Sequence, residues 1–485
     1  MLSKEAAGAL QTCAGVESGI EAAIHAMDRT FQEEWCEGVL LVDADNAFNR
    51  LNRTAALHNI KRSCPLLHQF LHNSYKSPAK LHLGDGTFIL SKEGVTQGDT
   101  VAMAKYALGT RDLILRLKQE SEHVVQVWYA DDGNAGGRLR LLKEWWDLLN
   151  RIGPQYGVFP KPTKTNLVLK DSTLLPLAEE LFGEYGVKIT TEGNRQIGAV
   201  IGNEAFKHEF VTSKIEKWVL DVNQLADIAK EEPQAALSAF NVGMSQRWKF
   251  IQRTVKDIGH LFQPLEDAIR GNLLPAICGR VLSDSERRLV ALPYRYGGLG
   301  VLIPTETAER EYNASVRITS RLTDLICEQE NDITRLDRSA VADTKLEMKQ
   351  IKETFLKHKL DSLTAEMDVK GVRLVTAASE KGASSWLSAL PLKSRGYVLN
   401  KQEFRDALCL RYGWQISGMP IHCGCGDRNS LDHVLTCKAG GYVGMRHNVL
   451  RNIEAKLMEK VCHDVRIEPA LIPTADETIK GTVAD

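Results

Sequence analysis

The feature that most constrains this chain is a run of β-forming residues, 123–129, that leads into two adjacent acids, Asp131 and Asp132. Gly133 and Asn134 follow the acids and are typical of tight turns, so the sequence predicts a β-hairpin with the acids at or beside its tip. Two neighbouring carboxylates repel each other and are costly to keep ionised unless a cation joins them. Such a pair beside a core strand indicates divalent-metal binding for phosphate chemistry, and the alternative is a solvated acidic turn.

The size and composition of the chain set outer limits on its organisation. Its 485 residues exceed what one hydrophobic core usually supports, so about two to four domains are expected. The net charge of −1 does not by itself indicate a nucleic-acid partner, which would need local basic surfaces. No apolar run approaches ~18 residues, so neither a transmembrane helix nor a membrane partner is expected.

A third acid also follows a predicted strand. Residues 38–42 form a short continuous apolar run, which predicts a buried strand, and Asp43 comes directly after it. An acid in that place can face a cleft while the strand stays in the core. Helical spacing over 139–152 predicts an amphipathic helix, on which Trp145 and Trp146 are expected in the core rather than as a stacking platform.

Residues 93–100 predict a glycine-bracketed loop that leads into a helix. Gly94 and Gly98 allow the backbone to approach a ligand closely, and Gln97 offers both hydrogen-bond donors and acceptors. Just before this loop, residues 82–90 predict a β-hairpin with a Gly-Asp-Gly turn.

Four short segments now stand in order along the first part of the chain. They are Asp43 with Ala47 and Phe48, then Gly-Val-Thr-Gln-Gly-Asp at 94–99, then Tyr-Ala-Asp-Asp at 129–132, then Lys164 with Thr165. In identity, order and spacing they resemble palm motifs A, B, C and D of reverse transcriptases. The resemblance implies an α+β fold: a right-hand polymerase palm, built of an antiparallel sheet with helices, with partial fingers, a helical thumb and a small C-terminal zinc knuckle. One departure is Thr100, where the family usually has proline; this loosens the loop but removes no catalytic group.

The resemblance also implies catalytic roles for the matched residues. Asp43 and Asp131, with Asp132 as a further carboxylate, would hold two Mg²⁺ ions that activate a primer 3′-hydroxyl and neutralise the triphosphate. Lys164 would donate a proton to pyrophosphate; the alternative is a solvated surface lysine.

The same resemblance implies a nucleotide pocket. The backbone carbonyl of Ala44 would be a further metal ligand, and Gln97 and Gly98 would line the template and nucleotide pocket. Phe48 would act as a steric gate against a 2′-hydroxyl and select deoxynucleotides; the alternative is a core phenylalanine. The implied partners are an RNA template, a DNA primer or target, and dNTP.

Beyond the palm, the resemblance divides the chain into four regions. They are 1–203, partial fingers and palm; 204–290, a helical thumb; 291–415, a helical connector; and 416–485, a zinc knuckle with the start of a truncated endonuclease-like region. Within them, residues 196–202 resemble the hairpin that grips the primer, and 292–300 resemble a segment after the thumb of non-LTR retrotransposon polymerases. Helical spacing predicts thumb helices over 211–230, 233–256 and 258–271.

The last distinctive feature is a cluster of soft metal ligands. Its spacing is C-x-C-x7-H-x3-C, formed by Cys423, Cys425, His433 and Cys437. Three cysteines and an imidazole suit tetrahedral Zn²⁺, and the alternative is a set of unconnected reduced cysteines. The knuckle and the cations after it resemble the region before the nuclease of site-specific non-LTR elements. The cations expected to contact nucleic acid are Arg446, His447 and Arg451.

Together these features predict an RNA-directed DNA polymerase region of a LINE-like, non-LTR retrotransposon, with an intracellular and, by family resemblance, nuclear location. Only 42 residues precede Asp43, too few for the usual fingers strands, so a polyprotein fragment is expected. One alternative is a catalytically silent nucleic-acid-binding remnant. Another is an RNA-dependent RNA polymerase, against which Phe48 argues, because those enzymes tend to carry an acid there.

Overall fold

A five-stranded sheet forms the centre of the first half of the chain; the computed structural model describes residues 2–96, 98–336 and 338–468. The strands are β1 (Gly38–Val42), β4 (Val125–Tyr129), β5 (Asp132–Gly137), β6 (Asn166–Leu169) and β7 (Lys188–Thr190). Their order is β4-β5-β1-β6-β7, in which β6 and β7 are parallel and the other pairs are antiparallel. The predicted strand at 38–42 is confirmed, and all five of its residues are buried.

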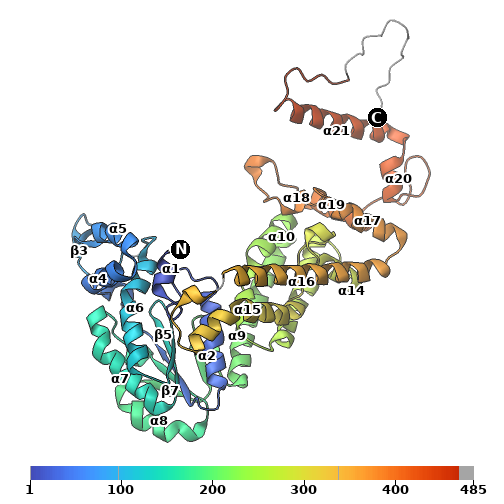
Figure 1. The fold of residues 1–485 in the computed structure, drawn as a ribbon. Coiled ribbons are helices and arrows are strands. Elements are labelled where there is room, and N and C mark those ends of the chain that lie inside the picture. Colours follow the sequence, from blue (N-terminus) through green and yellow to red (C-terminus); the bar gives the residue numbers. More distant parts are fainter. Residues whose placement is uncertain (1, 97, 337, 469–485) are drawn as a thin grey trace.

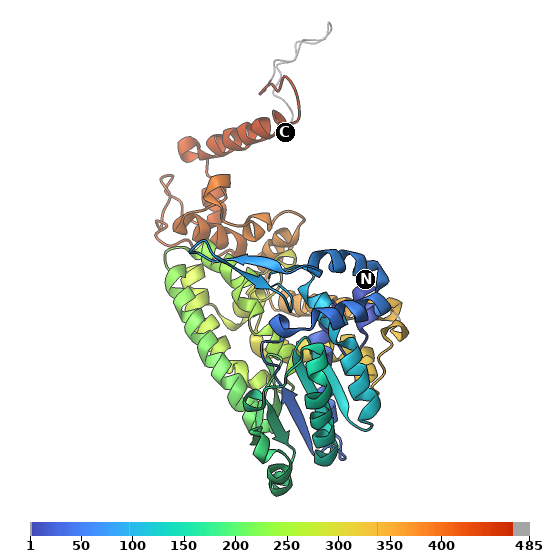
Figure 2. The same ribbon diagram turned by 90° about the vertical axis from the view of Figure 1, so that its left-hand side faces the viewer.

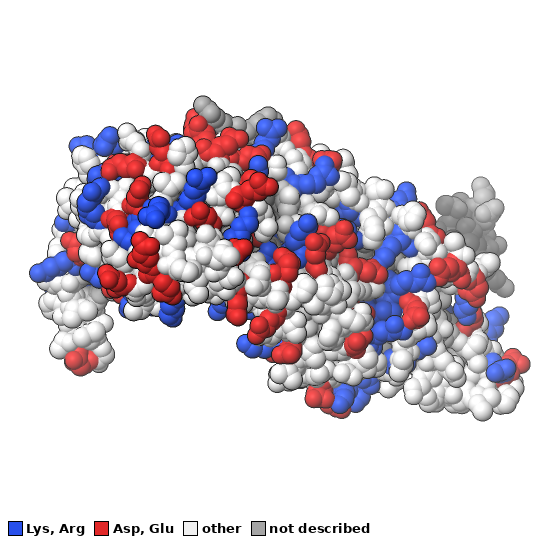
Figure 3. Space-filling view, turned by 90° about the horizontal axis from the view of Figure 1, so that it is seen from below, with Lys and Arg blue, Asp and Glu red and all other residues white. Residues whose placement is uncertain are grey.

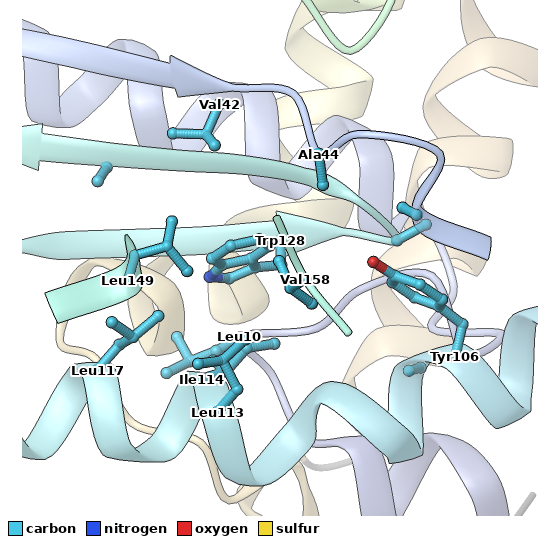
Figure 4. Packing of buried hydrophobic residues seen from close by; sticks show 14 of the residues in the cluster. Leu10, Val42, Ala44, Tyr106, Leu113, Ile114, Leu117, Trp128, Leu149 and Val158 are labelled. Carbon is cyan, nitrogen blue, oxygen red and sulfur yellow. The ribbon is translucent and has the colours of Figure 1, made fainter. Parts of the chain in front are cut away.

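Four helices cover the two faces of this sheet (Figure 1): α2 (Gly19–Gln32) and α15 (Pro304–Cys327) on one face, α6 (Ala102–Glu120) and α7 (Leu139–Tyr156) on the other. Successive side chains of a strand point to opposite faces. Val39 and Leu41 of β1 therefore pack in the core with α2, while Leu40 and Val42 pack in the core with α6 and α7 (Figure 4). Burial on both faces explains why β1 is continuously apolar.

A smaller lobe lies beside one end of the sheet. It contains α1 (Leu2–Ala7), α3 (Ala47–Arg50), α4 (Arg53–Ser63), α5 (Pro65–Tyr75), β2 (Ala79–His82) and β3 (Phe88–Ser91). Strands β2 and β3 form a separate antiparallel hairpin, which confirms the hairpin predicted at 82–90. Seen in Figure 2, this hairpin runs along the upper edge of the lobe.

A second hydrophobic core begins at the hairpin of β8 (Gly193–Gln196) and β9 (Ala199–Gly202), which contributes Val200. Its helices are α9 (Glu204–Ala229), α10 (Pro233–Val242), α11 (Lys249–Thr254), α12 (Gln263–Ala268) and α13 (Leu274–Cys278), followed by α14 (Asp284–Val290). The helix predicted over 233–256 is wrong, because α10 ends before Gly243. Glycine is a poor helix former, and the Ser245 hydroxyl donates to the carbonyl of Asn241, which competes with helical hydrogen bonds.

The region predicted as a connector is divided between the cores. Leu322 and Ile326 of α15 pack in the core with α2, whereas Phe404 and Leu408 of α19 (Lys401–Tyr412) pack in the second core. The remaining helices are α8 (Leu175–Phe182), α16 (Arg338–Ala365), α17 (Val369–Ser379), α18 (Ser385–Ser388), α20 (Leu431–Thr436) and α21 (Tyr442–Met458). Helix α21 stands apart from both cores in the two ribbon views.

The surface charge is mixed. On the face shown in Figure 3, lysines and arginines are interspersed with aspartates and glutamates, in keeping with the net charge of −1. That face offers no extended basic surface for a nucleic acid. Within 2–96, 98–336 and 338–468, none of the helices has the length and apolarity needed to cross a membrane.

Candidate functional site

The adjacent acids lie at the tip of the β4–β5 hairpin. Tyr129 pairs with Asp132, so Ala130 and Asp131 form the turn, and Ala130 adopts φ 56°. The predicted hairpin is confirmed, but the predicted turn residues are wrong, because Gly133 lies inside β5. A Cβ at Gly133 would lie 2.7 Å from ring atoms of Trp128, so the glycine makes room for the tryptophan rather than for a turn.

Strand pairing brings Asp43 to the same end of the sheet. Val42 is the partner of Gly133 in the β1–β5 register, so the chain leaves β1 opposite Asp132. The N–H of Lys161 donates to the carbonyl of Asp43 at 2.9 Å and fixes the backbone there. Lys164 Nζ lies 3.4 Å from Asp43 Oδ1. Motifs A, C and D of the resemblance therefore converge in space.

Burial and mutual repulsion shift the titration of the hairpin acids. Burial, followed by the charge of Asp43, raises the pKa of Asp131 above its usual range. Partial desolvation and then the charges of Asp131 and Asp43 raise the pKa of Asp132 to about 6, although this residue keeps solvent contact. The three carboxylates thus form one electrostatic unit, which a cation would stabilise.

We call the end of the sheet that holds Asp43, Asp131 and Asp132 the acidic corner. Its donor set suits Mg²⁺, which prefers carboxylate and carbonyl oxygens. Ala44 is 4% exposed and lies in an isolated antiparallel bridge with Pro160. The hydrogen bonds of this bridge run from the Asp45 N–H to the Phe159 carbonyl and from the Lys161 N–H to the Asp43 carbonyl. Among the described residues, the three aspartates are not drawn together as closely as a shared ion would require. Like charges repel, and Asp43 is paired with Lys164.

Phe48 stacks on Tyr106 of α6 beside this corner. The ring centroids are 4.6 Å apart at an interplanar angle of 26°, and Phe48 is half-buried. Tyr106 is buried with its hydroxyl directed toward the ends of the strands (Figure 4), and that hydroxyl has no hydrogen-bond partner. Burial, followed by the charge of Asp131, raises the pKa of Tyr106.

The loop corresponding to motif B is tied to the segment that follows Asp43. The N–H of Val95 donates to the carbonyl of Phe48 at 2.7 Å, and the N–H of Gly94 donates to the carbonyl of Leu51 at 2.9 Å. Gly94 has φ 73°, and a Cβ there would lie 2.4 Å from the Asn49 backbone, so only glycine fits. Gln97 falls outside the described residues.

Gly98 is exposed and lines a cavity of about 400 Å³. Other residues around this cavity are Arg53, Tyr75, Thr96 and Asp99. Gly98 is therefore accessible from solvent, as a residue of a nucleotide pocket would need to be.

Two buried polar residues near these motifs were missed by sequence reasoning. Lys105 of α6 is 0% exposed, with Nζ 3.3 Å from the centroid of Tyr75 and 3.3 Å from the Gly94 carbonyl. Burial, and then the charge of Arg53, lowers the pKa of Lys105 to about 7. Helical spacing places Lys105 on the buried face of α6, so the sequence contained a signal that this lysine is buried. Gln11, also 0% exposed, gave no local signal.

The four predicted zinc ligands form a second candidate site. Within 2–96, 98–336 and 338–468, they are the one group of three or more His, Cys, Asp or Glu whose donor atoms lie mutually close, within 4.8 Å. Cys423 Sγ lies 3.8 Å from Cys437 Sγ, and Cys425 Sγ lies 3.2 Å from His433 Nε2. Zn–S bonds of about 2.3 Å give a tetrahedral edge of about 3.8 Å, which matches the Cys423–Cys437 separation.

The cations after the knuckle already have protein partners. Arg446 donates to the carbonyl of Leu435 at 2.8 Å, and Arg451 pairs with Glu468 at 2.6 Å. His447 Nε2 lies 3.8 Å from the same Glu468 carboxylate. All three lie on α21, and a phosphate would have to compete with Glu468 for two of them.

Comparison with known proteins gives distant similarities. No family model matches the chain, and no curated protein does. A structure of apo telomerase from Candida tropicalis aligns with a TM-score of 0.32 at 12% identity, covering 68% of this chain and 57% of that one. A structure of telomerase from Candida albicans in complex with a TWJ fragment of telomeric RNA aligns with a TM-score of 0.34 at 12% identity, covering 67% of this chain and 53% of that one. The chain thus spans little more than half the length of these proteins.

Proposed function

We propose that this chain is the RNA-directed DNA polymerase region of a non-LTR retrotransposon, and that it adds dNTP to a DNA 3′-hydroxyl on an RNA template. The observation that carries the proposal is the convergence of Asp43, from the end of β1, with Asp131 and Asp132, from the β4–β5 hairpin. Motif order alone could arise by chance. Motif order together with convergence at one sheet end is what metal-dependent nucleotidyl transfer requires.

In this proposal the three aspartates and the Ala44 carbonyl hold two Mg²⁺ ions, which when bound would supply Lewis acidity and charge neutralisation. The chain's own residues do the rest. The Lys164 ammonium, 3.4 Å from Asp43, places a proton donor next to the departing pyrophosphate. Phe48, stacked on Tyr106, supplies the aromatic ring that would exclude a 2′-hydroxyl. Gln97 and Gly98 would line the nucleotide and template pocket.

The C-terminal segment is proposed to hold one structural Zn²⁺ through Cys423, Cys425, His433 and Cys437. A closed four-ligand site leaves no position for water, so it has no catalytic role. Its job in the proposal is to order the segment that leads to α21, from which Arg446, His447 and Arg451 contact a phosphate backbone. A nuclear location follows from the proposed life cycle of the element.

Primer extension on an RNA template by the purified chain tests the polymerase proposal. Asp43→Asn and Asp131→Asn should each lower the rate by about 10³-fold or more, since each removes a charged metal ligand. Asp147→Asn is a matched control, because Asp147 is an exposed acid of α7 paired with Lys143. Wild-type activity in Asp43→Asn or Asp131→Asn would contradict the metal assignment. Binding of RNA–DNA duplex that does not tighten with the matching dNTP would favour a silent nucleic-acid-binding protein.

A further inference from the structure

The N-terminal segment that precedes α2 runs along strand β4 of the β4–β5 hairpin. Gln11 forms an isolated parallel bridge with Trp128 of β4. The N–H of Trp128 donates to the carbonyl of Leu10 at 2.8 Å, and the N–H of Thr12 donates to the carbonyl of Trp128 at 2.9 Å. These bonds set Gln11 beside the last residues of β4, 119 positions away from Ala130 in sequence.

The Gln11 side chain forms hydrogen bonds with both backbone polar groups of one turn residue, Ala130. Its Oε1 accepts the N–H of Ala130 at 3.0 Å, and its Nε2 donates to the carbonyl of the same residue at 3.1 Å. Nε2 also lies 3.4 Å from Thr110 Oγ1 of α6. A reversed amide would set donor against donor, so these bonds select a single orientation.

These hydrogen bonds hold the one turn residue with a left-handed backbone conformation, Ala130. Ala130 has φ 56°, a conformation that residues other than glycine rarely adopt, and it is 4% exposed. In the β4–β5 ladder the pairing ends at Tyr129 and Asp132, so the ladder does not hold Ala130 itself. Without Gln11, both of its buried backbone groups would lose these partners. The next residue is Asp131, whose direction depends on the Ala130 backbone.

We propose that Gln11 is a positioning residue for the metal-binding carboxylates: it locks Ala130 in the left-handed conformation and so aims Asp131 and Asp132 at the acidic corner. Gln11 does not touch substrate or metal. The inference rests on the proposed function for its meaning, but the lock itself is a property of the folded chain. Groups that orient metal ligands typically change metal affinity by about 10- to 100-fold when removed.

Two variants separate positioning from general packing. Gln11→Met keeps the side-chain volume and loses both bonds to Ala130. Thr12→Val is the matched control, because Thr12 is equally buried on the same segment and its hydroxyl bonds to Trp128 rather than to the turn. Both variants lose buried hydrogen bonds and should lower the melting temperature, Gln11→Met by more because it loses two bonds to Ala130 and Thr12→Val loses one.

Two readouts then decide. Amide hydrogen exchange of the peptide 127–134 should rise at least about 10-fold in Gln11→Met and stay near wild type in Thr12→Val. Mn²⁺ affinity, titrated by electron paramagnetic resonance without nucleotide, should fall about 10- to 100-fold in Gln11→Met alone. Unchanged exchange in Gln11→Met, or equal changes in both variants, would contradict the proposal that Gln11 holds Ala130 in its left-handed conformation. A wild-type chain that binds no Mn²⁺ would instead overturn the proposed function, while the exchange result still decides about Gln11.

Discussion

The ammonium group of Lys164 lies 3.4 Å from Oδ1 of Asp43, although 121 residues separate them. Both side chains are well exposed, at 57% and 40%, so water screens their attraction. An exposed pair of this kind contributes little to folding stability. The pair is better understood as two groups that face the same space and can exchange partners when a substrate enters.

Replacing Lys164 should therefore affect the reaction more than the fold. Lys164→Met is expected to lower kcat of primer extension by about 10²-fold, the usual contribution of a general acid, while the unfolding free energy changes by less than about 1 kcal/mol. Lys161→Met is a matched control, since Lys161 Nζ lies 3.4 Å from Asp45 with similar exposure. Equal losses in the two variants would show a general effect of positive charge near the site rather than a specific proton donor at Lys164.

Sugar selection should depend on the Phe48 ring. Phe48→Ala is expected to let the chain incorporate ribonucleotides with a preference for deoxynucleotides reduced by about 10-fold or more, because removing the ring opens space for a 2′-hydroxyl. Tyr106→Phe keeps the stack and removes only an unpartnered hydroxyl, so discrimination should persist. Competition between dCTP and CTP in primer extension measures both. Unchanged discrimination in Phe48→Ala would make Phe48 a core residue only.

Local patterns predicted much of this fold because their causes are local. Strand β1 is apolar throughout because both of its faces are covered. Trp145 and Trp146 are buried, as their place on the apolar face of α7 predicted. The four zinc-ligand candidates are close in sequence, so spacing alone could bring them together.

Features that depend on long-range packing could not be predicted in the same way. Gly133 resembled a turn residue, but it makes room for the Trp128 ring within a strand. The bonds between Gln11 and Ala130 connect segments 119 residues apart, and no pattern near Gln11 indicates them. The aspartates were assigned through motif resemblance, and only the β1–β5 register explains why they lie at one end of the sheet.

The C-terminal knuckle should carry about one zinc per chain. Cys425→Ser is expected to lose that zinc and to make the segment around α20 sensitive to protease, because metal binding and local folding are coupled there. Cys462→Ser is the control, since Cys462 is an exposed cysteine outside the ligand group. Elemental analysis of the purified variants measures the metal. A zinc-free wild-type chain with equal protease resistance would contradict the assignment.

The arginines of α21 should contribute to nucleic-acid affinity if they contact phosphates. Arg446→Ala and Arg451→Ala are each expected to weaken duplex binding for all sequences and to reduce the slope of log affinity against log salt by about 1. Arg466→Ala is the control, an exposed arginine paired with Asp464. Filter binding at several salt concentrations measures the slope. Equal slopes for all variants would contradict the proposed role of the zinc site in presenting these cations to a phosphate backbone.

The last prediction concerns the buried Lys105. Its pKa is about 7 in the folded chain against 10.5 ordinarily, because burial disfavours the charged form. Between these two values the unfolded chain binds a proton that the folded chain does not, so this group makes the unfolding free energy rise with pH across that window.

Lys105→Met removes this titration. The difference in unfolding free energy between variant and wild type should favour the variant most below pH 7 and shrink by a few kcal/mol toward pH 10. Urea denaturation at several pH values measures this difference. The pH dependence contributed by the titratable groups that both chains share cancels in it. Lys61→Met, at an exposed position of α4, is the control for removing a lysine side chain. If the Lys105→Met difference did not vary with pH, Lys105 would have to be charged in the folded chain, held by the Tyr75 ring and the Gly94 carbonyl despite its burial.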